Sequence, residues 1–402
     1  MKILVCNAGS TSLKFKLYEM PACTVLATGK VERVGSCDDA IFGYCNTVTG
    51  YRVDAGKMNI PDYAVGINKF LFELTQGKGA VLTDIREIAR VGYKSVLSKN
   101  HYGVHEIDEA VMQGMRDFLP LAPVHNSAYL KAIETVQAVL PDARHVGVFE
   151  TAFHRDIPLE RKIYGVPYEW YEKLGVRRYG AHGTSHRYVA GEAAKLMGRP
   201  LKDLKLVTCH LGAGSSLCAI KNGKSFDTSM GFTPLTGVTM ATRSGDVDVS
   251  MIAFVMDKLG INSISEMVYT LNKESGLAGI SGVSSDMRDI LSVSHAKHRA
   301  RLAIDIFVKD IVKYIGQYYF EMGGIDGIVF TAGIGENSAV IRKMIMERLS
   351  FMNITIDNEK NEEQDGATVI SGEDSAITMM KIPTNEELMI ARDVMELKNK
   401  KK

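Results

Sequence analysis

The sequence predicts an α/β fold built from two related halves. A chain of 402 residues is too long for one ordinary hydrophobic core, so two domains are expected. Candidate strands and helices are mixed along the whole chain, which is typical of α/β proteins. The segment VCNAGSTSLKF, which starts at Val5, also matches the segment TCHLGAGSSLCA, which starts at Thr208 and has one extra residue in its turn. A strand, a glycine turn and a returning strand at corresponding places indicate an internal duplication.

The first half opens with three candidate strands. Residues 2–7 are almost continuously apolar, as in a buried strand, and residues 12–20 alternate apolar and polar side chains, as in a half-buried one. Residues 24–34 supply the third. Apolar residues at helical spacing follow in the segments 63–75, 109–118 and 128–139, and a short buried strand is expected at residues 144–150.

The second half repeats this beginning. Residues 204–227 read as strand, glycine turn, strand, turn and strand, and residues 299–322 form a long amphipathic segment that predicts a helix. Residues 327–338 predict a buried strand that breaks into a glycine-rich turn. Near the C-terminus, Thr384 lies three residues before Glu387, a spacing that predicts a capping box and a final helix.

Composition narrows the functional classes. The formal net charge of +1 argues against a nucleic-acid or membrane-surface binder, because either would need a strongly basic patch. No apolar stretch approaches the roughly 20 residues that span a bilayer. The 6 cysteines form no C-x-x-C pair, and several lie in apolar runs where buried reduced thiols are expected. A cytoplasmic protein that binds neither nucleic acid nor membrane is the resulting prediction.

Three glycine-rich turns, at residues 7–12, 210–216 and 333–337, point to a ligand. Glycine lets the backbone approach an oxyanion, and the N–H groups of such turns form anion-binding nests. The turns favour a polyphosphate, although the motifs G-x-x-x-x-G-K-[ST] and G-x-G-x-x-G after the first strand are absent. A duplicated actin-like ATPase (ribonuclease H-like) fold fits these observations. Its interdomain cleft would hold phosphates between a hairpin from each half.

The chain also resembles a particular family in its motifs. The segments NAGSTSLKF, RRYGAHGTSHRYVA, DTSMGFTPLTGVTMATRSGDVD, FTAGIGENS and IPTNEELMIARD are similar to successive signatures of the acetate kinases, and they run in order from residue 7 to residue 393. The resemblance therefore covers essentially the whole chain. It implies a homodimer and two domains, with residues 1–150 plus 385–402 in one and residues 151–384 in the other.

The resemblance implies reversible transfer of the γ-phosphoryl group of ATP to a short-chain carboxylate, giving an acyl phosphate and ADP. Charge spreads over the phosphoryl oxygens during such a transfer, so the site has to supply positioning and cations. By resemblance, His182 and Arg243 stabilise the transition state, His125 contacts the phosphoryl group, and Glu150 is the fourth catalytic residue. The planar fork of donors on arginine suits phosphate oxygens.

The nucleotide and metal contacts follow from the same resemblance. Asn7 and Glu386 resemble ligands of Mg²⁺, with Mn²⁺ as the alternative, and hard oxygen ligands suit such ions. Glu386 could instead be only a first-turn residue favoured by the helix dipole. The residues that resemble ATP contacts are Lys14, Ser10, Ser12, His210, Leu211, Gly212, Ala213, Gly214, Asp286, Met287, Arg288, Gly333, Ile334, Gly335, Glu336 and Asn337. Among them, Ala213 replaces the usual asparagine.

Several departures from the family pattern concern the acyl acceptor. Lys94 stands where a substrate-binding arginine is expected, and lysine keeps the charge but loses the bidentate fork. Glu150 replaces aspartate, and Ala181 replaces the phenylalanine that lines the acyl pocket. A carboxylate acceptor is already ionised at pH 7 and needs no general base. Glu150 is therefore expected to orient the substrate or a metal-bound water.

The loss of an aromatic wall at Ala181 predicts a wider acyl pocket, bounded by Val96, Val124, Ala181 and Pro234, and an acid larger than acetate. Another aromatic side chain filling the gap is the alternative. Two other functions stay open at this point. One is a binding-only relative that senses ATP or acyl phosphate. The other is a sugar or glycerol kinase, although a neutral hydroxyl acceptor needs a base, whereas the His/Arg arrangement suits an anionic acceptor.

Overall fold

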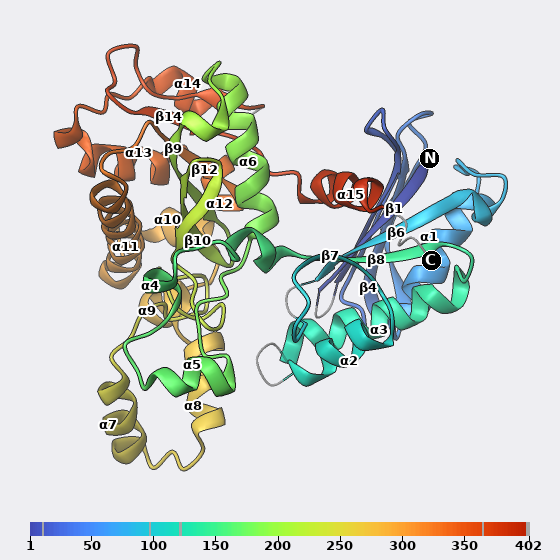
Figure 1. Cartoon of the computed structure of the whole chain (residues 1–402), viewed down its shortest axis with the longest axis horizontal. Helices are drawn as coiled ribbons and strands as arrows, with labels where there is room; N and C mark the ends of the chain where they lie inside the picture. Colours follow the sequence, from blue (N-terminus) through green and yellow to red (C-terminus); the bar gives the residue numbers. More distant parts are fainter. Residues whose placement is uncertain (10–11, 96–97, 120–122, 364–365, 399–402) are drawn as a thin grey trace. The chain divides into compact units, whose positions relative to one another are not determined.

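The computed structural model describes residues 1–9, 12–95, 98–119, 123–363 and 366–398, without the side chains of residues 37–38, 54–55 and 123–125. The chain divides into two compact units, coloured along the sequence in Figure 1. The first contains Met1–Ala152 and Asn385–Lys402, and the second contains Phe153–Thr384. Each unit is organised around its own mixed β-sheet.

The two sheets share one topology. The strand order is β5-β4-β3-β2-β1-β6-β8-β7 in the first unit and β11-β10-β9-β12-β14-β13 in the second. In each sheet an antiparallel meander (β1–β2–β3 or β9–β10–β11) continues into parallel strands (β6 and β8, or β12 and β14). The internal duplication is therefore confirmed. The strands are β1 Lys2–Ala8, β2 Ser12–Glu19, β3 Thr24–Glu32, β4 Ser36–Asn46, β5 Arg52–Ile60, β6 Ile88–Ser95, β7 Gly103–Glu106, β8 Arg144–Phe149, β9 Lys205–Leu211, β10 Ser215–Lys221, β11 Lys224–Thr228, β12 Gly327–Thr331, β13 Thr368–Val369 and β14 Thr378–Lys381.

Helices cover both faces of the first sheet. Helix α15, Glu386–Glu396, packs on β1, β6 and β8, where its apolar residues join one buried cluster with Val5 and Val148. A Cβ placed on Gly92 of β6 would lie only 2.7 Å from Val394, so the helix rests directly on the strand backbone. Helix α1, Tyr63–Thr75, covers the opposite face, where Phe70 stacks on Phe15. The other helices of this unit are α2 Glu109–Asp117 and α3 Pro123–Val139.

The final helix begins one residue later than the predicted capping box requires. Asn385, not Thr384, is the N-cap, and its Oδ1 accepts a hydrogen bond of 3.2 Å from the backbone N–H of Leu388. Glu387 instead pairs with Lys16 across a distance of 3.3 Å. The prediction of a final helix is correct, and the prediction of its cap is wrong: the Thr384 hydroxyl instead contacts that of Ser185, and its N–H donates to Glu336.

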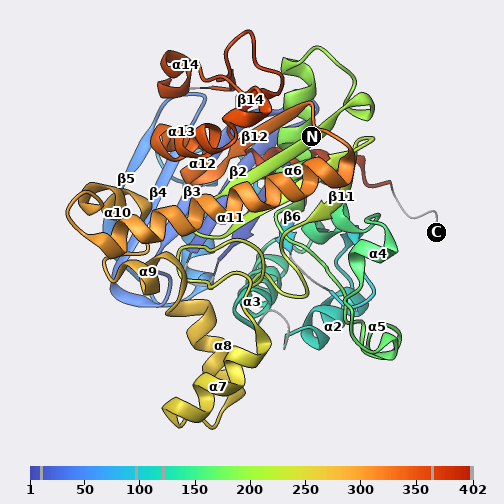
Figure 2. The ribbon, with the colours of Figure 1, turned by 90° about the vertical axis from the view of Figure 1, so that its left-hand side faces the viewer.

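Two helices cover the second sheet. They are α6, Gly183–Leu196, and α11, His298–Met322, which is the long orange helix of Figure 2. Side chains along a strand alternate between the two faces. Val207 and Cys209 of β9 join the cluster on the α11 side, whereas Leu206 joins the α6 cluster. The remaining helices are α4 Leu159–Lys162, α5 Tyr168–Leu174, α7 Val249–Leu259, α8 Ile264–Lys273, α9 Gly276–Ser281, α10 Met287–Val293, α12 Ala332–Asn337, α13 Ala339–Arg348 and α14 Asn358–Glu362.

The predicted glycine-rich turn after β12 is in fact the short helix α12, entered through Ala332 at a φ of 64°. Within the described ranges, no helix is both long and apolar enough to cross a membrane. The cysteines whose side chains are described are free thiols; Cys6, Cys209 and Cys218 are buried, while Cys23 and Cys45 are half-buried.

Candidate functional site

The first unit gathers three of the predicted site residues at the carboxyl edge of its parallel strands. Asn7 lies near the end of β1, Lys94 near the end of β6, and Glu150 directly after β8. The register pairs Cys6 with Tyr93 and Lys94 with Val148, so the three strands end side by side. Ligands of open α/β sheets bind at this kind of edge.

Alternation along the strands directs these side chains toward α15. Val5 and Val148 lie in the cluster beneath α15, and Gly92 touches the helix directly. Asn7, Lys94 and Glu150 are each two residues further along the same strand faces or their continuation. Glu386, the first residue of α15, completes the group.

Lys94 joins the two carboxylates of this group. Its Nζ lies 2.7 Å from Oε2 of Glu386 and 3.4 Å from Oε2 of Glu150. The three side chains are only 14%, 11% and 3% exposed, respectively. Burial by itself lowers the pKa of Lys94, but the charges of Glu150 and Glu386 outweigh burial and hold this pKa well above its usual value. Lys94 is therefore a cation held between two carboxyl groups.

In the second unit His182 and Arg243 converge on one point. A Cβ placed on Gly214 would lie 3.2 Å from Nη1 of Arg243 and 3.5 Å from Nε2 of His182. His182 occupies the N-cap position of α6 in the left-handed region, with a φ of 56°. Such a conformation is uncommon for a residue with a side chain and often marks a functional position.

Arg243 is a half-buried cation whose partners are neutral. Its Nη1 donates to the carbonyl of Pro234 at 3.2 Å and lies 3.6 Å from Sδ of Met240. Burial lowers the pKa of its guanidinium. Within the part of the chain that the structure describes, no carboxylate pairs with Arg243. A guanidinium has five N–H donors, so this one retains the capacity to bind an anion.

His210 stands beside His182. The two rings stack with centroids 4.0 Å apart and an angle of 16° between their planes. Nδ1 of His210 lies 2.8 Å from Oγ of Ser185, whose hydroxyl is 2.9 Å from that of Thr384. His210 was predicted as a nucleotide contact, and the structure places its ring against a predicted catalytic residue.

The glycine turn after β9 and the short helix α12 after β12 differ in what they can offer a ligand. After β9, the side chain of Leu211 lies in the hydrophobic core, so only its backbone is available. After β12, Oε1 of Glu336 accepts hydrogen bonds from the backbone N–H groups of Ala332 at 2.8 Å and Thr384 at 3.0 Å. Nδ2 of Asn337 donates to the carbonyl of Gly333 at 2.8 Å. The side chains of Glu336 and Asn337 therefore stabilise α12 through hydrogen bonds to the backbone.

A buried arginine supports α12. Nη1 of Arg342 donates to the carbonyls of Gly335 at 2.9 Å and Glu336 at 2.8 Å, and its Nε donates to Asn361. Burial lowers the pKa of Arg342 to about 10. The sequence carries no local signal for this role, because Asn361 lies in another helix.

The other predicted site residues lie in several different elements of the fold. Asp286 caps α10 and pairs with the exposed Arg288 at 2.6 Å, while Met287 points into the core. Lys14 is exposed on β2 opposite Asn7, at a strand that begins with Ser12. Ala181 lies in a small buried cluster with Met230 and Met240. Ser10 and Val96, and the side chains of Val124 and His125, lie outside the described residues. The remaining predicted residues, Gly212, Ala213 and Ile334, are in the turns described above.

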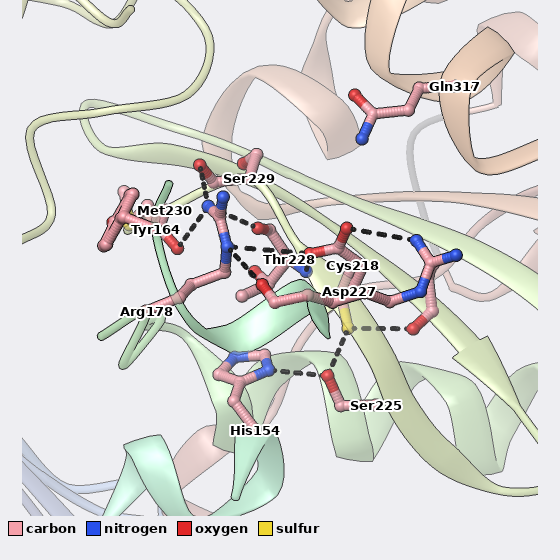
Figure 3. Close-up of polar contacts among 12 residues, drawn as sticks. His154, Tyr164, Arg178, Cys218, Ser225, Asp227, Thr228, Ser229, Met230 and Gln317 are labelled. Atoms are coloured by element: carbon pink, nitrogen blue, oxygen red, sulfur yellow. Dashed lines mark hydrogen bonds and ion pairs between the residues drawn. The ribbon is translucent and has the colours of Figure 1, made fainter. Parts of the chain in front are cut away.

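The stretch that carries His182 is anchored by Arg178 (Figure 3). Nη1 of Arg178 donates to the carbonyls of Thr228, Ser229 and Met230, at distances of 3.1, 3.4 and 3.4 Å. The N–H groups of Tyr179 and Gly180 donate to the carbonyl of Gly231. These bonds tie the residues before His182 to the segment that leads to Arg243.

Asp227 is the acidic partner of Arg178. Its carboxylate lies 3.8 Å from Nε of Arg178 and 3.7 Å from Nη1 of Arg161, which also pairs with Glu321. Burial raises the pKa of Asp227 to about 6, even though the two arginines oppose the shift. The sequence shows Asp227 only as the first residue of a motif, so its burial is a result of the fold.

Comparison with known proteins adds to this geometry. A profile of the Acetokinase family matches residues 2–392. An acetate kinase of Limosilactobacillus fermentum is 46% identical over 400 residues, which cover 99% of each chain. The crystal structure of Porphyromonas gingivalis acetate kinase superimposes with a TM-score of 0.88 at 40% identity over 98% of each chain. A propionate kinase structure from Francisella tularensis gives a TM-score of 0.90 at 35% identity, over 99% of this chain and 100% of that one.

The raised pKa of Asp227 makes stability depend on pH. The folded protein binds this proton more tightly than the unfolded chain does, so the stabilisation is complete below pH 3.8 and is lost as pH rises through about 6. The loss amounts to about 3 kcal/mol by pH 7. In the Asp227→Asn variant this loss is absent, so we expect urea unfolding midpoints that change less between pH 4.5 and 7.5 than those of the wild type.

The variant Asp156→Asn is the matched control, because it removes an exposed carboxylate paired with Lys224. It should keep the pH dependence of the wild type. Parallel pH dependences for the wild type and Asp227→Asn would contradict the assignment of a titrating, buried Asp227.

Proposed function

The chain belongs to the acetokinase family, and from this premise we propose that it transfers the γ-phosphoryl group of ATP reversibly to a short-chain carboxylate. The observation that supports the proposal most is the convergence of Arg243 and His182 beside Gly214. A cation with only neutral partners and an imidazole, next to a glycine turn, suit the oxygens of a transferring phosphoryl group. The matched proteins are named as kinases and give no support to a binding-only sensor.

The proposed roles follow the acceptor chemistry. Arg243 and His182 donate hydrogen bonds to the phosphoryl oxygens, where negative charge is redistributed in the transition state. The acceptor is already ionised near pH 7, so no residue has to remove a proton from it. Glu150, which pairs with Lys94, orients the substrate or a metal-bound water. His125 keeps its proposed contact with the phosphoryl group by resemblance.

Lys94 has a more complex role than a simple replacement for arginine. Two of its interactions are with Glu386 and Glu150. An ammonium group has three N–H donors, and of these two contacts only the one with Glu386 is a hydrogen bond, so donors are left for the acid's carboxylate. Lys94 therefore binds the acid as a single point of positive charge, without the two parallel bonds that arginine forms.

We propose Mg²⁺, with Mn²⁺ as the alternative, as the cation that accompanies the nucleotide, held by Asn7 and Glu386. The described residues contain no group of three or more His, Cys, Asp or Glu side chains that could hold a metal ion. This fits Mg²⁺, which keeps several waters and is shared with substrate phosphates instead of being caged by protein. When bound, the ion would neutralise part of the phosphate charge. The amide oxygen of Asn7 and the carboxyl group of Glu386 would supply hard oxygen ligands for such a cation at this edge.

The acyl pocket is proposed to be lined by methionine where the family has phenylalanine. Ala181 is buried against Met230 and Met240, and Met240 lies beside Arg243, which also binds the carbonyl of Pro234. Methionine is flexible and fills irregular space, so a thioether wall can retreat from a longer acyl chain. The two methionines support the proposal that no aromatic side chain replaces the missing phenylalanine, and the wider pocket remains a prediction.

A panel of acids tests both the reaction and the pocket. We expect acyl phosphate formation with a maximum of kcat/KM at an acid larger than acetate, measured over straight and branched acids of increasing length. The variant Ala181→Phe should shift preference toward acetate by about tenfold, since one methylene in an apolar pocket changes rates by that order. It should also lower stability by about 1–3 kcal/mol, because Met230 or Met240 has to move.

No transfer to any acid would refute the proposed function. A clear maximum at acetate in the wild type would refute only the wider pocket, since the reaction itself would stand. A variant with unchanged acid preference would place Ala181 outside the pocket.

The neighbouring pair Glu386 and Glu387 tests the metal site. In Glu386→Gln the carboxylate is lost from the proposed site, so we expect the Mg²⁺ concentration for half-maximal rate to rise about tenfold at fixed ATP. Calorimetric titration of nucleotide with and without Mg²⁺ gives a readout that does not depend on turnover. The matched control is Glu387→Gln, which removes the partner of Lys16 from the same helical turn.

The control should show the Mg²⁺ dependence of the wild type. An unchanged Mg²⁺ dependence in Glu386→Gln would mean that Glu386 acts only as a first-turn residue of α15 and as the partner of Lys94.

We also propose a cytoplasmic homodimer that forms through α7 and α8. These helices lie side by side in Figures 1 and 2 and carry exposed apolar side chains, among them Val249 (81% exposed), Phe254 (63%) and Leu259 (69%). Large apolar side chains gathered on adjoining helices are typical of protein interfaces. We propose that a second copy of the chain binds this surface, because a twofold axis brings the same patch of two subunits together.

Sedimentation velocity tests the dimer. The double variant Phe254→Asp/Leu259→Lys should shift a wild-type dimer to monomer, because charges would be buried in the interface. The control Phe320→Asp alters a side chain that is 82% exposed on α11 and should remain dimeric. A wild-type monomer, or a double variant that stays dimeric, would rule out this interface.

A further inference from the structure

His154 is a buried imidazole that the proposed roles leave unused. It is the second residue of the second unit, and it is only 1% exposed. Its Nε2 lies 3.0 Å from the carbonyl oxygen of Ala181, and its Nδ1 lies 2.8 Å from Oγ of Ser225. A buried ring with a hydrogen-bond partner on each nitrogen is held in one orientation. His154 therefore presents a fixed edge to the residue directly before His182.

The contact with Ala181 decides which nitrogen of His154 is the donor. A carbonyl oxygen can only accept, so the hydrogen bond requires the proton on Nε2. Burial lowers the pKa of His154 to about 4; the charge of Arg178 adds to this shift, and the bond to Ala181 opposes it. The ring is therefore neutral at pH 7. Its Nδ1 then accepts a hydrogen bond from the hydroxyl of Ser225.

The backbone that His154 contacts has an unusual conformation. Gly180 has a φ of 76° and His182 a φ of 56°, so both lie in the left-handed region. Glycine adopts this region freely, whereas a residue with a side chain stays there only when its surroundings hold it. A Cβ placed on Gly180 would lie 2.5 Å from Cδ2 of His154. The imidazole therefore packs directly on the backbone of this turn.

Hydrogen bonds hold the turn at both ends. The N–H of Gly180 donates to the carbonyl of Gly231 at 3.2 Å, and the carbonyl of Ala181 accepts from His154. The carbonyl of Ala181 and the N–H of His182 belong to one planar peptide group, so the bond from His154 sets the orientation of that plane. His182 then begins α6 with its ring beside Arg243.

We propose that His154 is a positioning residue for the phosphoryl transfer: its Nε2–H holds the peptide group between Ala181 and His182, and this places the ring of His182 beside Arg243. His154 acts through the backbone of His182 and does not itself touch ATP or the acid. The proposal rests on the proposed function, but the hydrogen bond to Ala181 can be measured without turnover.

Two amide variants separate donation to Ala181 from simple filling of space. The amide group of glutamine reaches the place of Nε2, whereas that of asparagine reaches only the place of Nδ1. His154→Gln should therefore keep the bond to Ala181, and His154→Asn should lose it. A small misplacement of a catalytic group can lower a rate by about 10²-fold, so we expect His154→Asn to lower kcat by about tenfold or more. The KM for ATP should change little, because His182 acts in the transition state. His154→Gln should restore most of kcat.

The matched control is His145→Asn. His145 of β8 is a second buried imidazole, but it belongs to the first unit. Its Nε2 lies 2.9 Å from the carbonyl oxygen of Leu140, and its Nδ1 lies 2.7 Å from the hydroxyl of Tyr93. It thus has the same two kinds of partner as His154. The control should lose stability in urea unfolding much as His154→Asn does, and it should keep the kcat of the wild type.

One NMR signal reports the hydrogen bond to Ala181. The sequence contains a single alanine that is followed by histidine, at Ala181 and His182. Deuterated protein with ¹³C in its alanine carbonyls and ¹⁵N in its histidine amides therefore gives one carbonyl–amide correlation. A carbonyl that accepts a hydrogen bond resonates downfield of one that does not. We expect the Ala181 signal to move upfield in His154→Asn and to keep its wild-type position in His154→Gln and His145→Asn.

An Ala181 signal that does not move in His154→Asn would overturn the proposal, and so would a moved signal with unchanged kcat. Equal losses of kcat in His154→Gln and His154→Asn would also overturn it, because donation to Ala181 would then not matter. A comparable loss in His145→Asn would mean general destabilisation. If the wild type transfers phosphate to no acid, the proposed function fails, and the carbonyl signal still decides whether His154 donates to Ala181.

Discussion

Taking a cation out of water requires an anion or hydrogen-bond acceptors to meet it, and the sites of both units follow from this constraint. Lys94 meets it with the carboxyl groups of Glu386 and Glu150 at the edge of the first sheet. Arg243 meets it only partly, through a carbonyl and a thioether. The first arrangement suits a metal ion beside an acid, and the second suits the oxygens of a phosphoryl group.

The same constraint explains the residues that surround the second site. Arg178 is satisfied by three carbonyls and by the buried Asp227, and this joins the backbone before His182 to the segment before Arg243. Burial is the main cause that lowers the pKa of His186 and of His154, and neighbouring positive groups lower both values further. Arg243 is the guanidinium that faces the Gly214 turn beside His182.

Internal duplication gives both sites the same framework. In each sheet a hairpin lies beside two further parallel strands. Several polar residues of each site lie on or directly after these strands: Asn7, Lys94 and Glu150 in the first unit, and Thr208, His210 and Ser216 in the second. Side-chain alternation then assigns them to one face, under α15 in the first unit and under α6 in the second. The two faces differ in chemistry. Carboxylates and lysine mark the first, while histidines and hydroxyls mark the second.

The sequence by itself determined the α/β class, the repeated hairpins, the helix at residues 63–75 and the motif residues His182, Arg243, Lys94 and Glu386, because periodicity and motifs are local in the chain. It carried no signal for β4 and β5, for the cap at Asn385, or for the methionines against Ala181. Only the tertiary structure decided which groups meet. Thr208, Ser216 and His186 come from two strands and a helix, and Lys94 and Glu386 are 292 residues apart. Burial, pairing and tautomer depend on such distant neighbours, so they become definite only when the chain is folded.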